Sequence, residues 1–228
     1  MRRIFTADEA VSPHGDWPGQ TVYDIGCGEG DLVRWATRQG ASVTGIDTAE
    51  MLAKAAAVPK AGGERYVIAG AERLPFRTES ADVLLYFASL HHVAGDRLEA
   101  ALGEGARVLK PGGRAVFVEP VAAESPYAEI TRLTGDETAI QAKAYAALKS
   151  ASRCGLSMTV EERLFIERSF EDYIHLIETF VGDAALRAKI LAEARAIAEG
   201  KAAEAGVPFG DFRLRSVCRL NVYVRRRI

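Results

Sequence analysis

Three glycines at alternate positions, Gly26, Gly28 and Gly30, are well placed in this chain to hold a small charged molecule. They follow a short β-prone run, residues 22–25, and precede an apolar helical pattern, so we expect a strand, a tight turn and a helix. Glycine permits a positive φ and leaves no Cβ atom where a ligand comes close. The free N–H groups at the start of the helix would then point at that ligand.

A carboxylate follows this turn at the distance that nucleotide sites use. Asp47 lies 21 positions after Gly26, at the end of a second predicted strand, and can accept both hydroxyls of a ribose. Dinucleotide sites use the spacing G-x-G-x-x-G, but here the third glycine comes one position early. Asp31 occupies the position of the third glycine in that pattern, and its negative charge would face a pyrophosphate. The turn therefore disfavours a nicotinamide dinucleotide, and no Lys-Ser or Lys-Thr follows it as a P-loop requires.

The stretch Asp-Ile-Gly-Cys-Gly-Glu-Gly, residues 24–30, closely resembles the first motif of the class I S-adenosylmethionine-dependent methyltransferases. Asp47 matches the acidic residue that holds the ribose in that family. The ligand of that family carries a sulfonium and no phosphate, so acidic residues around it are favourable. The plain alternative is a tight turn in a protein without a nucleotide. From the resemblance we expect these residues to bind S-adenosylmethionine: Asp24, Gly26, Cys27, Gly28, Gly30, Asp47 and Thr48.

A second stretch, Gly-Ala-Glu-Arg-Leu-Pro-Phe over residues 70–76, resembles the family's next signature. That signature usually begins with an acid that binds the adenine amino group, and Gly70 stands in its place. Either Glu72 takes over this contact, or the backbone of Ala71 and a water molecule hold the adenine. A plain surface turn is the alternative. Phe87, at the end of a later predicted strand, completes the expected cofactor site.

Two histidines, His91 and His92, follow the predicted strand 83–87, and ligands of doubly wound sheets bind outside such strand ends. The run Leu-His-His-Val, residues 90–93, resembles the segment found there in small-molecule methyltransferases, including those of quinone biosynthesis. Imidazole titrates near neutral pH, so either histidine is a candidate catalytic base. The alternative is that both only cap the strand and the following helix.

Other side chains could also approach the acceptor. Glu119 ends the predicted strand 114–119, and His175 lies on a predicted helix of the lid. We expect no metal, because paired histidines without a nearby Cys, Asp or third His lack the ligand set of a protein metal site.

The order of predicted elements indicates an α/β protein. The run Arg-Val-Leu-Lys-Pro-Gly-Gly-Arg, residues 107–114, resembles a structural signature of the family. We expect a Rossmann-like doubly wound seven-stranded sheet, mostly parallel with an antiparallel last strand, and helical lid insertions. The predicted strands are 22–25, 42–46, 65–69, 83–87, 114–119, 159–168 and 212–224.

We expect a single domain over residues 1–228, with a core at about 20–120 and a final strand at about 211–226. Helical lid insertions are expected at about 121–158 and 169–208. Residues 1–20 show little periodicity and are expected to form a loop or short helix over the site. Ser169 and Asp172 form a capping-box pattern that would begin a lid helix.

Composition narrows the classes of partner. The formal net charge is −2, which favours neither nucleic acid nor an anionic membrane, and the apolar runs are too short to span a bilayer. The sequence also lacks the Asn/Asp-Pro-Pro-Tyr element and the Pro-Cys pair of base-methylating enzymes. The cysteines, Cys27, Cys154 and Cys218, have no metal spacing, and the first six residues are too short and polar for a signal peptide. We therefore expect a cytoplasmic location.

The sequence thus predicts transfer of a methyl group from S-adenosylmethionine to a small organic acceptor by in-line displacement. The alternative is a protein that binds S-adenosylmethionine without small-molecule turnover, or that methylates a protein partner. The acceptor atom, which can be O, N or C, and the oligomeric state stay open.

Overall fold

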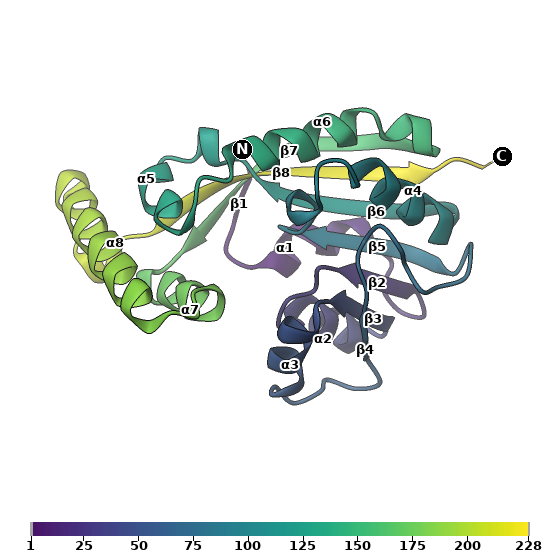
Figure 1. The fold of residues 1–228 in the computed structure, drawn as a ribbon, viewed down its shortest axis with the longest axis horizontal. Helices are drawn as coiled ribbons and strands as arrows, with labels where there is room; N and C mark the ends of the chain where they lie inside the picture. Colours follow the sequence, from purple (N-terminus) through teal and green to yellow (C-terminus); the bar gives the residue numbers. More distant parts are fainter. Residues whose placement is uncertain (1, 228) are drawn as a thin grey trace.

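The computed structural model describes residues 2–227, which form one eight-stranded sheet with helices on both faces (Figure 1). The strand order is β1-β7-β8-β6-β5-β2-β3-β4. The strands are β1 (Arg2–Ile4), β2 (Thr21–Ile25), β3 (Ser42–Asp47), β4 (Arg65–Ile68), β5 (Ala81–Phe87), β6 (Leu109–Pro120), β7 (Leu156–Arg168) and β8 (Leu214–Arg225).

The helices divide between the two faces of the sheet and a lid beyond its end. Short 3-10 turns join several of them, and one, η2 (Leu90–His92), carries the two histidines. The α-helices are α1 (Ala7–Val11), α2 (Asp31–Arg38), α3 (Ala49–Ala56), α4 (Leu98–Val108), α5 (Ala128–Thr131), α6 (Thr138–Lys149), α7 (Phe170–Phe180) and α8 (Ala184–Ala205). In the described part of the chain, no helix is both long enough and apolar enough to cross a membrane.

The topology confirms a mostly parallel sheet. Strands β4, β3, β2, β5 and β6 are parallel neighbours, and β8 runs antiparallel to both β6 and β7. The antiparallel last strand is therefore confirmed. Because parallel neighbours end at the same edge, the segments that follow β2, β3, β5 and β6 all meet there.

The sheet has one strand more than the seven predicted. Residues 1–20 were expected to form a loop or short helix, but β1 pairs in parallel with β7, with Ile4 opposite Ile166. A strand of three residues has no measurable alternation, and its partner lies about 160 positions away, so no local pattern indicates it. The expected short helix is α1, which buries Ala10 and Val11.

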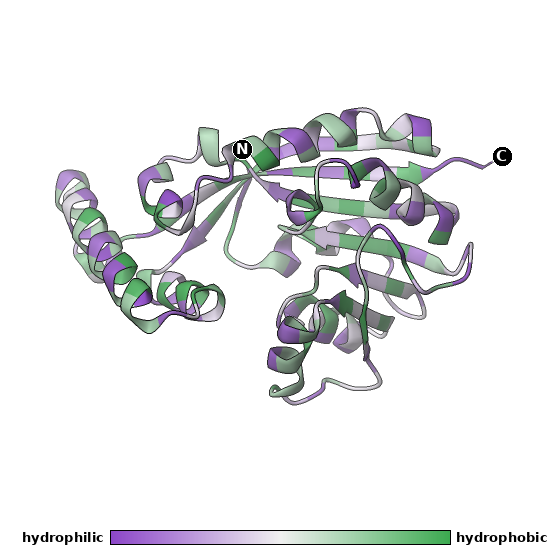
Figure 2. Cartoon of the chain, viewed as in Figure 1, coloured by the Kyte–Doolittle hydropathy of each residue, from purple (hydrophilic) through white to green (hydrophobic). Residues whose placement is uncertain are grey.

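The core consists of two clusters, one on each face of the sheet. In β6, Ala115 and Phe117 pack on one face with α4 and α6, while Val116 and Val118 pack on the other with α1 and α2. Strands that are covered on both faces carry nearly continuous apolar runs, and Figure 2 shows this in the central strands.

A third cluster forms the lid. Helices α5, α7 and α8 pack together beyond the end of the sheet, at the left of Figure 1. Their shared core includes Ile130, Tyr173 and Ile190. The predicted capping box is confirmed, because Ser169 and Asp172 exchange hydrogen bonds at the start of α7.

Candidate active site

The glycine turn joins β2 to α2 at the edge of the sheet where the parallel strands end. Gly26, Gly28 and Gly30 all have positive φ, at 75°, 55° and 87°. The N–H groups of Gly26 and Cys27 both donate to the carbonyl oxygen of Ile46, at 2.8 and 3.1 Å. The turn is therefore held against β3, the strand that ends at Asp47.

The three glycines serve different purposes. A Cβ atom on Gly26 would overlap the side chain of Ser89, and one on Gly30 would lie 2.5 Å from the hydroxyl of Tyr66. Packing within the protein therefore requires glycine at both positions. A Cβ atom on Gly28 would have no protein atom closer than 3.8 Å. Gly28 is thus the member of the turn that faces open space, as a ligand-binding glycine should.

The carboxylate of Asp47 is fixed beside Gly28. Its Oδ2 accepts the Gly28 N–H at 2.8 Å and its Oδ1 accepts the Thr48 N–H at 2.7 Å. Each oxygen keeps a lone pair, so the group can still accept two hydroxyls. The hydroxyl of Thr48 accepts the Met51 N–H and caps α3. The structure thus gives Thr48 a role in orienting Asp47 and starting the helix.

Asp24 lies under the turn and has a buried acceptor without a donor. It is 2% exposed, and among residues 2–227 its Oδ1 has no hydrogen-bond partner. Burial, followed by the charges of Asp47 and Asp31, raises the pKa of Asp24 to about 7. Burial also raises the pKa of the Cys27 thiol, so that group is not a nucleophile at neutral pH. An unpaired buried carboxylate oxygen suits a ligand that brings a positive charge.

Both groups predicted for adenine lie together after β4. A Cβ atom built on Gly70 would lie 2.6 Å from Oε2 of Glu72. The Glu72 carboxylate therefore fills the space where an acidic side chain at position 70 would begin, and Arg97 holds its other oxygen at 3.2 Å. Within the described residues, the N–H of Ala71 has no hydrogen-bond partner. Phe87 is half-buried at the end of β5.

Glu119 is a buried anchor for the histidine turn. Its Oε2 lies 2.5 Å from Nδ1 of His91, and its Oε1 accepts the N–H groups of Leu90 at 2.9 Å and Ser89 at 3.2 Å. The sequence analysis named Glu119 as a side chain that could approach the acceptor. The structure instead directs both of its oxygens into the protein, where they orient His91.

A second acidic residue joins this cluster from the segment before α6. Oε2 of Glu137 lies 3.5 Å from Nε2 of His91, and donor atoms of His91, His92 and Glu137 all lie within 4.8 Å of one another. The sequence analysis missed Glu137. It follows His91 by 46 positions in a region without family motifs, so only the packing of α6 on η2 reveals it.

The two histidines differ in charge and exposure. His91 is 4% exposed; its burial lowers the pKa, but hydrogen bonds to Glu119 and Glu137 raise it by more, to about 9. Burial of its ring, followed by the charge of His91, lowers the pKa of His92, although part of this residue is exposed at the surface. At neutral pH, His91 is thus protonated between two carboxylates, whereas His92 is neutral and able to accept a proton.

The lid reaches the glycine turn through α7. The Thr179 hydroxyl donates to Oε1 of Glu29 at 3.2 Å, and Lys54 of α3 donates to the Thr179 carbonyl at 2.6 Å. The sequence analysis named His175 as a side chain that could approach the acceptor. Its side chain is 72% exposed, and its Nε2 lies 3.5 Å from Oε2 of Glu29. The structure therefore places His175 beside the glycine turn.

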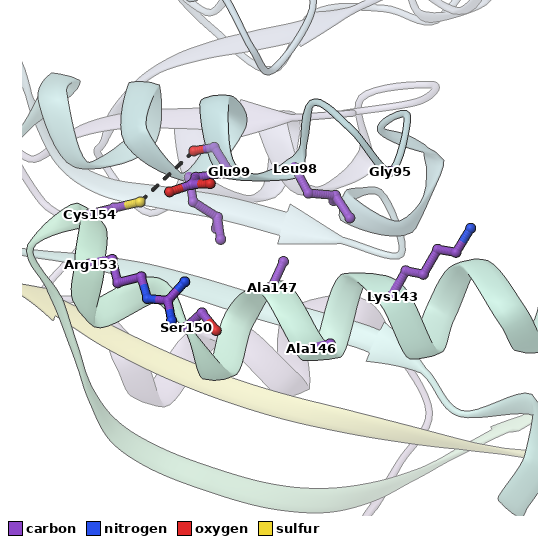
Figure 3. A pocket seen from close by; sticks show the side chains of 10 residues that line it. Gly95, Leu98, Glu99, Lys143, Ala146, Ala147, Ser150, Arg153 and Cys154 are labelled. Atoms are coloured by element: carbon purple, nitrogen blue, oxygen red, sulfur yellow. Dashed lines mark hydrogen bonds between the residues drawn. The ribbon is translucent and has the colours of Figure 1, made fainter.

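A cavity of about 320 Å³ opens elsewhere, between α4 and α6 (Figure 3). Glu99, Lys143, Arg153 and Cys154 line it with small and apolar residues. It shares no lining residue with the glycine turn or the histidine cluster. We therefore assign the candidate active site to the edge of the sheet and not to this cavity.

Comparisons with known proteins identify the kind of domain that this part of the chain resembles. Residues 23–117 match the methyltransferase domain family. An uncharacterized methyltransferase from Geobacillus kaustophilus is 32% identical over 121 residues, which cover 52% of this chain and 55% of that protein. The ubiquinone/menaquinone biosynthesis C-methyltransferase UbiE of Cereibacter sphaeroides is 35% identical over 115 residues, covering 46% and 45%.

The likeness in structure extends further than the likeness in sequence. The crystal structure of the YcgJ protein from Bacillus subtilis aligns with a TM-score of 0.62 and 23% identity, over 92% of this chain and 93% of that one. The chain nevertheless spans only about half the length of the curated relatives it matches. The matched residues contain the glycine turn, Asp47 and both histidines. Residues 23–117 thus form a methyltransferase domain of the class I, S-adenosylmethionine-dependent family.

Proposed function

We propose that the protein transfers the methyl group of S-adenosylmethionine to a small organic acceptor by in-line displacement. The observation that carries this proposal is the open space over Gly28, beside the fixed carboxylate of Asp47. Bound S-adenosylmethionine supplies a methyl group that its sulfonium has already activated. The protein has to bind and orient the two reactants and to exclude water. Alignment of this kind can lower the reaction barrier by roughly 7–11 kcal/mol.

The residues of the turn suit a cationic adenosine derivative. In this proposal Asp47 accepts the ribose hydroxyls, and the unpaired Oδ1 of Asp24 faces the positively charged end of the ligand. Glu72 and the free N–H of Ala71 bind the adenine. Glu72 thereby replaces the acid that Gly70 lacks. A pyrophosphate would meet these carboxylates unfavourably, which is why we do not propose a nicotinamide dinucleotide.

On the acceptor side, we assign the proton-accepting role to His92. It is neutral at pH 7 and exposed, whereas His91 already holds a proton between Glu119 and Glu137. His91 is then a positioning residue that sets the direction of the η2 turn. The quinone-biosynthesis relative supports a small aromatic or enolic acceptor, and removal of a proton from its hydroxyl would make the attacking oxygen or carbon more nucleophilic.

We further propose that the chain is a single cytoplasmic domain without a nucleic-acid partner. Cys27, Cys154 and Cys218 are all free thiols, which supports a reducing compartment. A net charge of −2 supports a small-molecule acceptor over a polyanion.

Calorimetric titration with S-adenosylmethionine and, separately, with NAD tests the cofactor. We expect binding of the first alone. Asp47→Ala removes a charge-assisted pair of hydrogen bonds worth about 1.5–3 kcal/mol, so its affinity should fall roughly ten- to a hundredfold. Glu50→Ala, an exposed acid on neighbouring α3, is the matched control and should bind normally. Wild-type affinity in the Asp47 variant, or preference for NAD, would overturn the assignment.

Turnover tests the second half of the proposal. The protein is incubated with S-adenosylmethionine and a pool of small phenols and quinols, and S-adenosylhomocysteine is measured. We expect product only with the pool present. Tight cofactor binding without product would instead favour the alternative function, in which the protein binds S-adenosylmethionine or methylates a protein partner.

A further inference from the structure

We propose that His91, His92 and Glu137 form a binding site for a divalent transition-metal ion. Two imidazoles and one carboxylate converge there from separate segments, with one donor atom of each within 4.8 Å of the others. Sites with two histidines and one glutamate are a known way to hold zinc while leaving one position open. Neither the methyltransferase family match nor the proposed methyl transfer implies this site.

The first ligand is held by a buried partner. Nδ1 of His91 faces the Glu119 carboxylate at 2.5 Å, so Nε2 points toward Glu137. Glu119 is fixed in turn by the N–H of Leu90 at 2.9 Å. Metal-binding histidines commonly use their second nitrogen in this way, because a carboxylate fixes the ring and makes the other nitrogen more basic.

The carboxylate ligand has its own support. The side-chain N–H of Gln141 donates to Oε2 of Glu137 at 3.2 Å, and Oε1 of Gln141 accepts the Ala122 N–H at 2.9 Å. Gln141 lies one turn after Glu137, the residue just before α6, so the two side chains are neighbours at the start of the helix.

The distances suit a tetrahedral ion. A metal bound at about 2.0–2.1 Å separates its ligand atoms by about 3.3–3.4 Å. Nε2 of His91 and Oε2 of Glu137 lie 3.5 Å apart, so this edge is already nearly correct. The third donor atom, on the exposed ring of His92, lies within 4.8 Å of both. The ion would replace the proton that His91 and Glu137 otherwise share.

The donor set also selects the ion. Two nitrogen donors and one oxygen favour zinc and its neighbours over magnesium or calcium, which prefer oxygen alone. Three protein ligands leave a fourth position for water or for a hydroxyl of the acceptor. A hydroxyl bound to the metal would lose its proton to water more readily, so in the metal-bound protein solvent, and not His92, would take that proton.

The test is titration of the chelator-treated protein with Zn²⁺ by calorimetry, and with Co²⁺ by visible absorption, without S-adenosylmethionine. We expect one ion per chain and a Co²⁺ spectrum typical of nitrogen ligands. Glu137→Gln and His92→Asn change residues that are not buried, so the fold should persist, which circular dichroism checks. Each should lower affinity at least about tenfold.

The matched control is His175→Asn, which removes an exposed histidine outside the cluster and should leave metal affinity unchanged. No binding in the wild type, or equal binding in wild type and the Glu137 variant, would overturn the proposal. Because no cofactor is added, a negative result here is independent of the S-adenosylmethionine titration. A protein that binds zinc but not S-adenosylmethionine would contradict only the proposed function.

Discussion

Nδ1 of His91 lies 2.5 Å from Oε2 of Glu119, and this buried contact joins the end of β6 to the turn that follows β5. The same carboxylate accepts two backbone N–H groups of the turn. A single acid therefore fixes both the imidazole and the backbone that carries it. Its removal should affect the charge of His91 and the stability of the fold together.

The first prediction concerns the pH dependence of stability. The pKa of His91 is raised to about 9 in the folded protein. The charged His91 therefore stabilises the fold fully below about pH 6.5, and this stabilisation is lost as the pH rises through 9. The free energy of unfolding should therefore fall over this range, by on the order of 3 kcal/mol at most. Urea unfolding at several pH values measures it.

The matching variant is Glu119→Gln. Loss of the carboxylate should lower the pKa of His91, which an NMR titration of the imidazole follows, and should flatten the stability curve above pH 6.5. Glu99→Gln, an exposed acid on α4, is the control and should leave both unchanged. An unaltered His91 titration in the Glu119 variant would show that this ion pair does not set its charge.

Asp24 gives a prediction of opposite sign. Its pKa of about 7 exceeds its usual value of 3.8, so ionisation of Asp24 destabilises the folded protein. This loss of stability grows between pH 3.8 and 7 and reaches its full size above pH 7. Asp24→Asn should therefore be more stable than wild type at pH 8 and about equal at pH 3.5. Thermal melting at both pH values checks this difference.

The same substitution should weaken cofactor binding, because a negative charge that faces the cationic ligand is lost. Asp31→Asn, whose acid is 88% exposed beside Arg34, is the control for charge alone. A variant that is more stable at pH 8 and binds S-adenosylmethionine as tightly as wild type would show that Asp24 does not face the ligand.

Much of the central sheet could be predicted from sequence because its signals are local. The apolar runs of β2 and β5, the glycine turn and Asp47 all lie within short windows, and each was placed correctly. The different roles of the three glycines could not be predicted from sequence. Their spacing along the chain does not show whether an added Cβ atom would meet Ser89 or open space. That difference depends on which later segments of the chain pack against the turn.

The acceptor side was less predictable for the same reason. Glu119 and Glu137 reach His91 from positions 28 and 46 residues later in the chain. Neither separation corresponds to the repeat of a helix or a strand, so no local sequence pattern predicts these contacts. The small strand β1 likewise depends on a partner in β7, far along the sequence. Contacts between distant segments, and not local propensity, build this half of the site.

Gly28 offers a direct test of the cofactor space. Ala at this position meets no protein atom within 3.8 Å, so the folding penalty should come only from its φ of 55°, about 1–3 kcal/mol. Gly155→Ala is a matched control, because Gly155 has a φ of 84° and also meets nothing within 4 Å. We expect both variants to lose similar stability, but only Gly28→Ala to lose S-adenosylmethionine binding. Equal binding in the two would show that Gly28 does not touch the ligand.

The lid gives the last prediction. Thr179 of α7 donates to Glu29 of the glycine turn, so this hydrogen bond joins the lid to the turn. Thr179→Val keeps the shape of the side chain and removes this hydrogen bond, worth about 0.5–1.5 kcal/mol. Dissociation of S-adenosylhomocysteine should become roughly two- to tenfold faster, as surface plasmon resonance can measure. Thr134→Val, whose exposed hydroxyl bonds only within its own turn, should not alter that rate. Equal rates in both variants would mean that α7 does not retain the ligand through Glu29.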